Sequence, residues 1–201
     1  MTRKETTKTR CWGDDDPLAR RYHDREWGTP LHSDRKLFEF LILEGFQAGL
    51  SWMTILRKRE NFRKAFDGFD YRKIALYGRR KLASLMADQG IVRNRLKIEA
   101  AVTNARAFLE VRKEFGTFDA YIWGFVEGRP IDDELAGFEA MPSRTELSDR
   151  ISLDLKKRGF KFIGSTVIYA HMQATGMVND HLKSCFRYEE LKAAARRKPP
   201  V

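Results

Sequence analysis

The sequence is poor in cysteine and has no long apolar segment. Only Cys11 and Cys185 among its 201 residues are cysteine, and they lie near opposite ends of the chain. A disulfide between them is not expected in a cytosolic protein. No apolar run approaches the roughly 20 residues of a membrane span, and the opening stretch MTRKETTKTR is not a signal peptide. These shortages favour a cytoplasmic protein with no membrane partner.

The sequence also lacks any sustained alternation of apolar and polar residues, any internal repeat, and any Gly-rich nucleotide loop followed by a strand. What it has instead are helix starts and apolar positions at helical spacing. We expect an all-α fold. Four helices would begin at capping residues: Ser33 or Asp34, Ser51, Asp70 and Thr117. Three more would cover Lys81–Ala87, Asn94–Phe115 and Glu146–Arg158, and a further apolar helix would contain Val167, Ile168, Ala170 and Met172. A loop is expected over Ile131–Ser143.

Positive charge is in excess. There are 38 Lys and Arg against 28 Asp and Glu, a formal net charge of +10, which favours a polyanionic partner such as nucleic acid. A basic surface without such a partner would give the same count, and basic ends inflate it. We expect one globular domain over residues 11–188, a basic disordered arm over residues 1–10 and a basic tail over residues 189–201 that is disordered from Ala193.

Four cysteine and histidine residues could form one metal site. Cys11 and His23 are twelve residues apart, and His181 and Cys185 are four apart, which would place the second pair on one face of a helix. Two cysteines and two histidines make a closed zinc set with no position for a catalytic water. The site would therefore be structural and would tie the N-terminal segment to the C-terminal one. Two unrelated buried thiols remain the alternative.

Aromatic residues gather close to the first cysteine. Trp12, Tyr22 and Trp27 lie within sixteen positions at no helical period, either as core anchors of an irregular segment or as walls of a pocket for a flat or cationic ligand. Glu44 follows the most apolar part of its helix. It is either an exposed residue at a helix end, or a poised acid or base that can also accept a hydrogen bond from the edge of a nucleobase.

Two turns between predicted helices are candidates for contact with a nucleic acid. Gly49-Leu50 precedes the helix that begins at Ser51, and it is either a plain tight turn or an apolar wedge that enters a base stack. Gly159–Gly164 separates two further helices. Its backbone N–H groups, together with the positive end of the second helix, suit a phosphate.

Together these stretches resemble the 3-methyladenine DNA glycosylase I family, within the helix-hairpin-helix DNA glycosylases. The resemblance covers nearly the whole chain from Cys11 to Tyr188. It is carried by CWGDDDPL, YHDREWG, KLFEFLILEGFQAGLSWMTILRKRENFRKAF, GIVRNRLKI, NARAF and LKKRGFKFIGSTVIYAHMQATGMVNDH, with Cys185 behind it. It departs at Phe46, where some relatives have a polar residue, and by one residue between Cys11 and His23.

The resemblance implies a helix-hairpin-helix fold and excision of 3-methyladenine from alkylated double-stranded DNA after base flipping. It implies a structural Zn²⁺ held by Cys11, His23, His181 and Cys185. It further implies that Glu44 is the catalytic residue that recognises the base. Trp12, Tyr22 and Trp27 would line the base pocket, with Trp52 for stacking, and Gly49 and Leu50 would form the wedge. The hairpin would contact phosphates through Lys161, Gly164, Ser165 and Thr166.

Three alternatives bear on the mechanism. A lyase that uses a lysine nucleophile is not expected, because Ser165, Thr166 and Val167 follow the hairpin glycine. Asp180 would either cap the helix of the zinc ligands or stabilise the sugar cation. A zinc-stapled DNA-binding module without chemistry would share the fold and the charge, but it needs no pocket.

We expect a monomer, located in the bacterial cytoplasm and on the nucleoid when bound to DNA.

Overall fold

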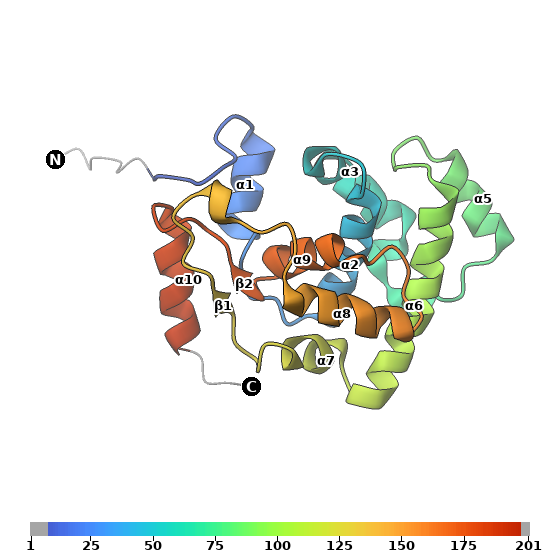
Figure 1. Cartoon of the computed structure of the whole chain (residues 1–201). Coiled ribbons are helices and arrows are strands. Elements are labelled where there is room, and N and C mark those ends of the chain that lie inside the picture. Colours follow the sequence, from blue (N-terminus) through green and yellow to red (C-terminus); the bar gives the residue numbers. More distant parts are fainter. Residues whose placement is uncertain (1–7, 198–201) are drawn as a thin grey trace.

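The computed structural model describes residues 8–197, and nearly all regular structure in that range is helical (Figure 1). The predominantly α-helical prediction is confirmed. None of the helices in this range is long and apolar enough to cross a membrane. In chain order they are α1 (Pro17–Arg25), α2 (Asp34–Gln47), α3 (Trp52–Ala65), α4 (Tyr71–Ile74), α5 (Arg79–Ala87), α6 (Arg95–Phe115), α7 (Phe118–Gly124), α8 (Glu146–Lys157), α9 (Ser165–Ala174) and α10 (Phe186–Arg197), with 3₁₀ turns η1 (Asp67–Phe69) and η2 (Phe138–Ala140).

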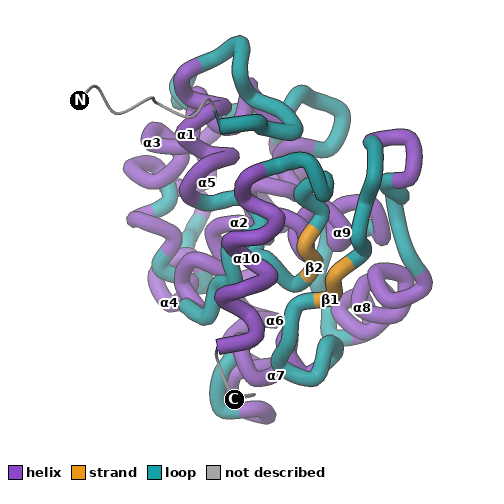
Figure 2. The backbone as a smooth tube through the Cα atoms, turned by 90° about the vertical axis from the view of Figure 1, so that its left-hand side faces the viewer, coloured by secondary structure: helices purple, strands orange, loops and turns teal. Residues whose placement is uncertain are grey.

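The region predicted as a loop over Ile131–Ser143 contains one strand of the only β pairing among the described residues. Strand β1 (Ile131–Asp132) runs parallel to β2 (Val178–Asn179), with Ile131 opposite Val178, and the two lie side by side in Figure 2. The same region also contains η2. A pairing two residues long is too short to produce a period-two pattern in the sequence.

Helix starts follow the predicted capping residues in most cases. Ser51, Asp70 and Thr117 each accept a hydrogen bond from a backbone N–H in the first turn of the helix that follows. The start of α2 differs, because Ser33 forms no side-chain cap there. Asp34 instead accepts hydrogen bonds from the Arg112 guanidinium and from the backbone N–H of Asp119, which joins α2 to α6 and α7.

Helix α2 is the centre of the fold. Every residue from Leu37 to Phe46 is buried, and the helix contacts α3, α6, α7 and α9. The amphipathic helix predicted from Leu37, Phe38, Leu41 and Ile42 is therefore wrong in one respect: the opposite face is covered as well, by α1 and α3. Because no side of α2 faces water between Leu37 and Phe46, Glu39 and Glu44 are buried along with the apolar residues.

Helices α8 and α9 pack against each other and are joined by a short turn over residues 158–164, as predicted. Gly159 has φ +92°, a conformation that favours glycine. Helix α9 in turn packs on α2. At Gly45 a side chain would meet the carbonyl oxygen of Phe162 at 3.3 Å, so the absence of one lets the turn approach the backbone of α2 closely.

The segment before α1 meets the start of α10 on one side of the molecule, toward the left in Figure 1. The carbonyl of Thr9 accepts a hydrogen bond from the backbone N–H of Phe186 at 3.0 Å. Arg10 is hydrogen-bonded to Asp24, and α10 continues to Arg197. The expected disorder is thus wrong for residues 8–10 and 193–197. Residues 1–7 and 198–201 lie outside the described range.

His181 and Cys185 do not share a helix face, contrary to prediction. They lie in a turn between β2 and α10. Gly176 reverses the chain at φ +71° and β2 is extended, so no helix runs through these positions. Spacing of four residues is compatible with a tight turn as well as with a helix.

Candidate active site

A cavity of about 530 Å³ opens between α1, α2, α3 and α9. It brings together Glu44 and the four aromatic residues predicted for the base pocket. Its remaining lining comes from the segment before α1, from α1, from the end of α2, from the start of α3 and from α9. The lining residues are Trp12, Gly13, Asp15, Asp16, Ala19, Tyr22, Trp27, Glu44, Gln47, Ser51, Trp52, Met53, Ala170 and Gln173.

Aromatic rings form a continuous wall of this cavity. The ring of Trp12 lies edge-on to that of Trp27, with centroids 5.2 Å apart, and 6.0 Å from that of Tyr22. Tyr22 in turn lies 5.4 Å from Trp52. Such a wall presents π faces and edges to a flat ligand, and a cationic ring would be favoured over a neutral one. The alternative of core anchors applies in part, because Tyr22 and Trp27 are buried while they line the cavity.

Glu44 is the buried carboxyl group of the cavity. Only 4% of the residue is exposed, and within residues 8–197 no side chain or backbone group is hydrogen-bonded to its oxygens. Burial raises the pKa of Glu44 to about 8, and the positive charge of Arg59 opposes that rise. The carboxyl can therefore be protonated near neutral pH, and a cationic ligand beside it would favour its ionised form.

A polar atom of Trp52, a residue of the cavity lining, also has no partner. The indole Nε1 of Trp52 is buried and is not hydrogen-bonded to any described residue. A buried N–H without an acceptor costs about 1–3 kcal/mol. Sequence reasoning assigned Trp52 to stacking and did not identify this donor, because burial of one edge of the ring depends on the packing of α3.

Sequence reasoning also missed a buried ion pair behind the pocket. Arg59, 6% exposed, donates to Glu39 and to Glu26, both at 2.6 Å. Its guanidinium lies 4.8 Å from the ring of Phe40, which packs against Tyr22. The three charged residues come from α2, α3 and the end of α1, the same helices that carry much of the cavity wall. The sequence feature that could have indicated this buried ion pair is Glu39, an acidic residue between two phenylalanines.

Asp180 lies behind another part of the wall. It is 1% exposed and accepts hydrogen bonds from the Tyr169 hydroxyl and from Nε2 of Gln173, both at 2.7 Å. The predicted helix cap is wrong, because no helix begins after Asp180. Since Gln173 lines the cavity, the carboxylate orients one amide of the cavity lining.

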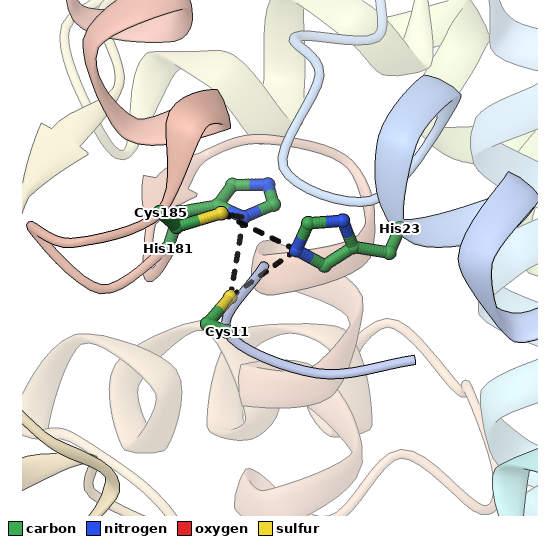
Figure 3. Close-up of side chains that lie close together, drawn as sticks. All are labelled: Cys11, His23, His181 and Cys185. Atoms are coloured by element: carbon green, nitrogen blue, oxygen red, sulfur yellow. Dashed lines mark hydrogen bonds between the residues drawn. The ribbon is translucent and has the colours of Figure 1, made fainter. Parts of the chain in front are cut away.

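The four predicted metal ligands lie together (Figure 3). The ligand atoms of Cys11, His23, His181 and Cys185 are all within 4.8 Å of one another. Nε2 of His23 is 3.2 Å from the sulfur of Cys11 and 3.4 Å from that of Cys185, and Nδ1 of His181 is 3.5 Å from both. Tetrahedral zinc with nitrogen and sulfur ligands separates them by about 3.3–3.8 Å. The group could therefore hold a metal ion.

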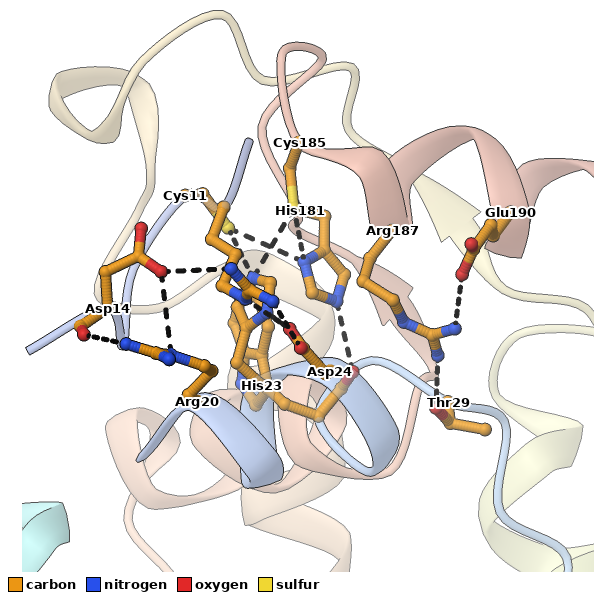
Figure 4. A network of polar contacts seen from close by, with 12 residues as sticks. Cys11, Asp14, Arg20, His23, Asp24, Thr29, His181, Cys185, Arg187 and Glu190 are labelled. Atoms are coloured by element: carbon orange, nitrogen blue, oxygen red, sulfur yellow. Dashed lines mark hydrogen bonds and ion pairs between the residues drawn. The ribbon is translucent and has the colours of Figure 1, made fainter. Parts of the chain in front are cut away.

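The surroundings of the cluster also suit a metal (Figure 4). Nδ1 of His23 is 2.8 Å from the Asp24 carboxylate, and Nε2 of His181 is 3.1 Å from the carbonyl of Trp27. An oxygen acceptor on the second ring nitrogen is the usual support of a metal-binding histidine, since it fixes the tautomer. Hydrogen bonds from Cys11 and from both histidines lower the pKa of the Cys185 thiol far below its ordinary value, which favours the thiolate that binds metals. The hydrogen bond to Cys185 and burial raise the pKa of the Cys11 thiol, which keeps its proton while no ion is bound.

The turn at Gly49-Leu50 leaves an apolar side chain at the surface. Gly49 has φ +82° and Leu50 is 39% exposed. Gln47, two residues before Gly49, lines the cavity. The predicted wedge thus lies at the side of the pocket rather than in the core.

The predicted phosphate-binding residues lie at the start of α9. Gly164 precedes the helix, which has no side-chain cap, and Lys161 is exposed. The hydroxyl of Ser165 is 2.7 Å from that of Ser148 in α8. Uncapped N–H groups at a helix N-terminus are available to an anion, whereas the Ser165 hydroxyl already has a partner inside the hairpin.

Comparison with known proteins gives a consistent result. The methyladenine glycosylase family matches residues 12–188. DNA-3-methyladenine glycosylase 1 of Escherichia coli (strain K12) is 46% identical over 180 residues, which cover 89% of this chain and 96% of the relative. A crystal structure of 3-methyladenine DNA glycosylase I superposes with a TM-score of 0.86 at 47% identity, covering 89% and 98% of the two chains. A tyrosine-to-phenylalanine variant of 3-methyladenine DNA glycosylase I, solved in complex with 3-methyladenine, superposes with a TM-score of 0.85 at 35% identity over 88% and 95%.

Proposed function

This chain belongs to the 3-methyladenine DNA glycosylase I family, and we propose that it excises 3-methyladenine from alkylated double-stranded DNA. The reaction would be hydrolysis of the N-glycosidic bond, with release of the free base and an abasic site left in the strand. The observation that carries the proposal is the buried, unpartnered carboxyl of Glu44 at a cavity walled by Trp12, Tyr22 and Trp27.

The cavity can only act on a base that has left the duplex. The enzyme would flip the damaged nucleotide, and the cost of unstacking is lowest for a damaged pair. Leu50, exposed on its turn, would fill the space left in the stack. The turn between α8 and α9 would form the hairpin of a helix-hairpin-helix motif. Lys161, Gly164 and Thr166 and the N–H groups at the start of α9 would hold the phosphates there.

A purine methylated at N3 is cationic, so its glycosidic bond is already weakened. The aromatic walls would favour the cationic ring over the neutral one by about 1–2 kcal/mol. Glu44 would ionise beside the cation and accept a hydrogen bond from the adenine edge. Water would attack the oxocarbenium-like sugar.

We propose no lyase step. The residues after the hairpin glycine are Ser165, Thr166 and Val167, and none offers the amine that such a step requires. Trapping with borohydride is expected to give no covalent protein–DNA adduct.

Zinc would be held by Cys11, His23, His181 and Cys185, in a site with no open position. Its role would be structural, joining the segment before α1 to the turn before α10. The chain would act as a monomer in the cytoplasm, on the nucleoid when bound to DNA.

The test is to incubate the purified protein with methylated genomic DNA and to identify the released bases by chromatography. Release of 3-methyladenine with 7-methylguanine left behind is expected. Glu44→Gln keeps the size of the side chain but cannot ionise, and Glu44→Ala removes it; both should lose most of the activity. Normal excision by both variants would reject the role of Glu44. Absence of any released base from folded wild-type protein that binds DNA would favour the non-catalytic DNA-binding module.

A further inference from the structure

Helix α6 holds the end of α2 through a buried lysine. Lys97 is 8% exposed, and its ammonium donates to the carbonyl of Phe46 at 2.9 Å and to that of Ala48 at 2.6 Å. The last carbonyls of a helix have no partner within it, so a charged donor at this position closes the end of α2. Gly49 and Leu50 follow immediately.

The turn itself is fixed by two more hydrogen bonds. The backbone N–H of Leu50 donates to the carbonyl of Gln47 at 2.6 Å, and Nε2 of Gln47 donates to the carbonyl of Leu50 at 2.7 Å. The backbone is therefore held from α6 and from α2, while the side chain of Leu50 remains exposed. A rigid turn with one projecting apolar side chain suits insertion into a base stack.

The same helix holds the hairpin through a buried amide. Asn104 is 3% exposed; its Oδ1 accepts from the backbone N–H of Lys161 at 2.7 Å, and its Nδ2 donates to the carbonyl of Lys161 at 3.0 Å. The next residue, Phe162, has φ +55°, a conformation that costs a non-glycine residue about 1 kcal/mol or more. The two bonds from Asn104 stabilise this hairpin conformation.

Lys97 and Asn104 are seven residues apart, two helical turns, and so lie on the same face of α6 about 10 Å apart along its axis. We propose that α6 sets the spacing between the Gly49-Leu50 turn and the 159–164 hairpin, with Lys97 and Asn104 as positioning residues. Neither would contact DNA. The inference rests on the proposed function, because the spacing is relevant only if the 159–164 hairpin binds the DNA backbone and the Gly49-Leu50 turn opens the duplex.

Each residue should affect a different step. A looser Leu50 turn slows the opening of a duplex that is already bound, so loss of Lys97 lowers the rate at saturation. A looser hairpin weakens the grip on the phosphates, so loss of Asn104 raises the concentration needed for half-maximal rate. A misplacement of about 1 Å can change a rate by about 100-fold.

The experiment uses the full chain in three variants: Lys97→Met, Asn104→Leu and the control Lys113→Met. Lys113 lies at the exposed end of α6, where it pairs with Glu110. Single-turnover excision from a methylated duplex is measured over a range of protein concentrations. Lys97→Met should lower the saturating rate about 10- to 100-fold. Asn104→Leu should raise the half-saturating concentration about tenfold, which corresponds to about 1.4 kcal/mol. Lys113→Met should match the wild type.

Binding of free 3-methyladenine, measured by tryptophan fluorescence, separates positioning from damage to the fold. All three variants should bind the base like the wild type, because α6 contributes nothing to the cavity lining. Unchanged kinetics in both test variants, or a parallel loss of excision, base binding and thermal midpoint, would overturn the proposal.

Failure of the proposed function is visible separately, as a wild-type chain that releases no base. The role of α6 is then decided without chemistry, by the fluorescence of 2-aminopurine in a duplex, which reports unstacking. A signal that is equal in Lys97→Met and in the wild type would overturn the proposal; a smaller signal in Lys97→Met supports it.

Discussion

Trp27 and His181 are in edge-to-face contact, with ring centroids 4.6 Å apart and an interplanar angle of 76°. The carbonyl of Trp27 is also 3.1 Å from Nε2 of His181. Trp27 lines the cavity and His181 belongs to the Cys/His cluster. The ring of Trp12, which also lines the cavity, lies 5.1 Å from that of His23 in the same cluster. The cavity and the cluster therefore share a wall, and a disturbance of the cluster reaches the pocket through Trp12 and Trp27.

Loss of the metal should damage both stability and base binding. Cys185→Ala removes one of four ligands and is expected to release the zinc. The thermal midpoint should fall by about 10 °C, the equivalent of about 3 kcal/mol for a chain of this size. Metal analysis should find one zinc per wild-type chain, and tryptophan fluorescence should detect weaker binding of 3-methyladenine by the variant. Wild-type protein without metal, or a variant with an unchanged midpoint, would contradict this.

The burial of Glu44 should cost stability at high pH. Its pKa is about 8 in the folded protein and about 4.3 in an unfolded chain. Between these values the folded state binds more protons, so the contribution of Glu44 to stability falls as pH rises through this window, by a few kcal/mol. Glu44→Gln should be close to neutral at pH 4.5 and should stabilise the protein at pH 8.5. Urea denaturation at both pH values checks this, and an equal effect at both would refute it.

Local patterns predicted those parts of the structure that depend on neighbours in sequence. Ser51 and Thr117 cap helices because a hydroxyl there reaches an N–H three residues ahead. The grouping of Cys11, His23, His181 and Cys185 was also predictable, since four residues of the right type had few alternatives. The turn at His181 was not, because a spacing of four fits both a helix and a tight turn.

Features that depend on three-dimensional packing could not be predicted. Periodicity identifies an apolar stripe on α2, but whether Phe40 on the other face is covered depends on α1 and α3. Arg59 is hydrogen-bonded to Glu39 and Glu26, which lie 20 and 33 positions away from it in the sequence. In the sequence alone these residues are ordinary surface charges of two helices.

The pair of Arg59 and Glu39 should be strongly coupled. Arg59→Met leaves Glu39 buried with Arg63 as its remaining partner, at 2.8 Å. The loss should be about 3 kcal/mol, because a buried charge without its main partner is costly. Adding Glu39→Gln should restore part of that loss. A double-mutant cycle by urea denaturation measures the coupling, with Arg95→Met, from an exposed ion pair, as the control of near-zero effect. Additive single effects would contradict the prediction.

His171 should make the fold sensitive to acid. It is fully buried in α9, both ring nitrogens lack a partner among the described residues, and burial lowers its pKa to about 4. An unfolded histidine has a pKa of about 6.5, so the unfolded state binds more protons between these values. Stability therefore falls as pH drops from about 6.5 to about 4, by up to about 3 kcal/mol.

His171→Phe replaces the imidazole with an apolar ring and should remove this part of the acid sensitivity. At pH 7.5 the variant should be at least as stable as the wild type, because a phenyl ring has no polar nitrogens to leave unsatisfied. Its advantage should grow at pH 5.5 and again at pH 4.5 in urea denaturation. His32→Phe is the matched control, since His32 is partly exposed and hydrogen-bonded to Asp119. This variant should lose as much stability as the wild type between pH 6.5 and 4. If His171→Phe loses stability with the same slope as the wild type, the buried imidazole is not the group that titrates.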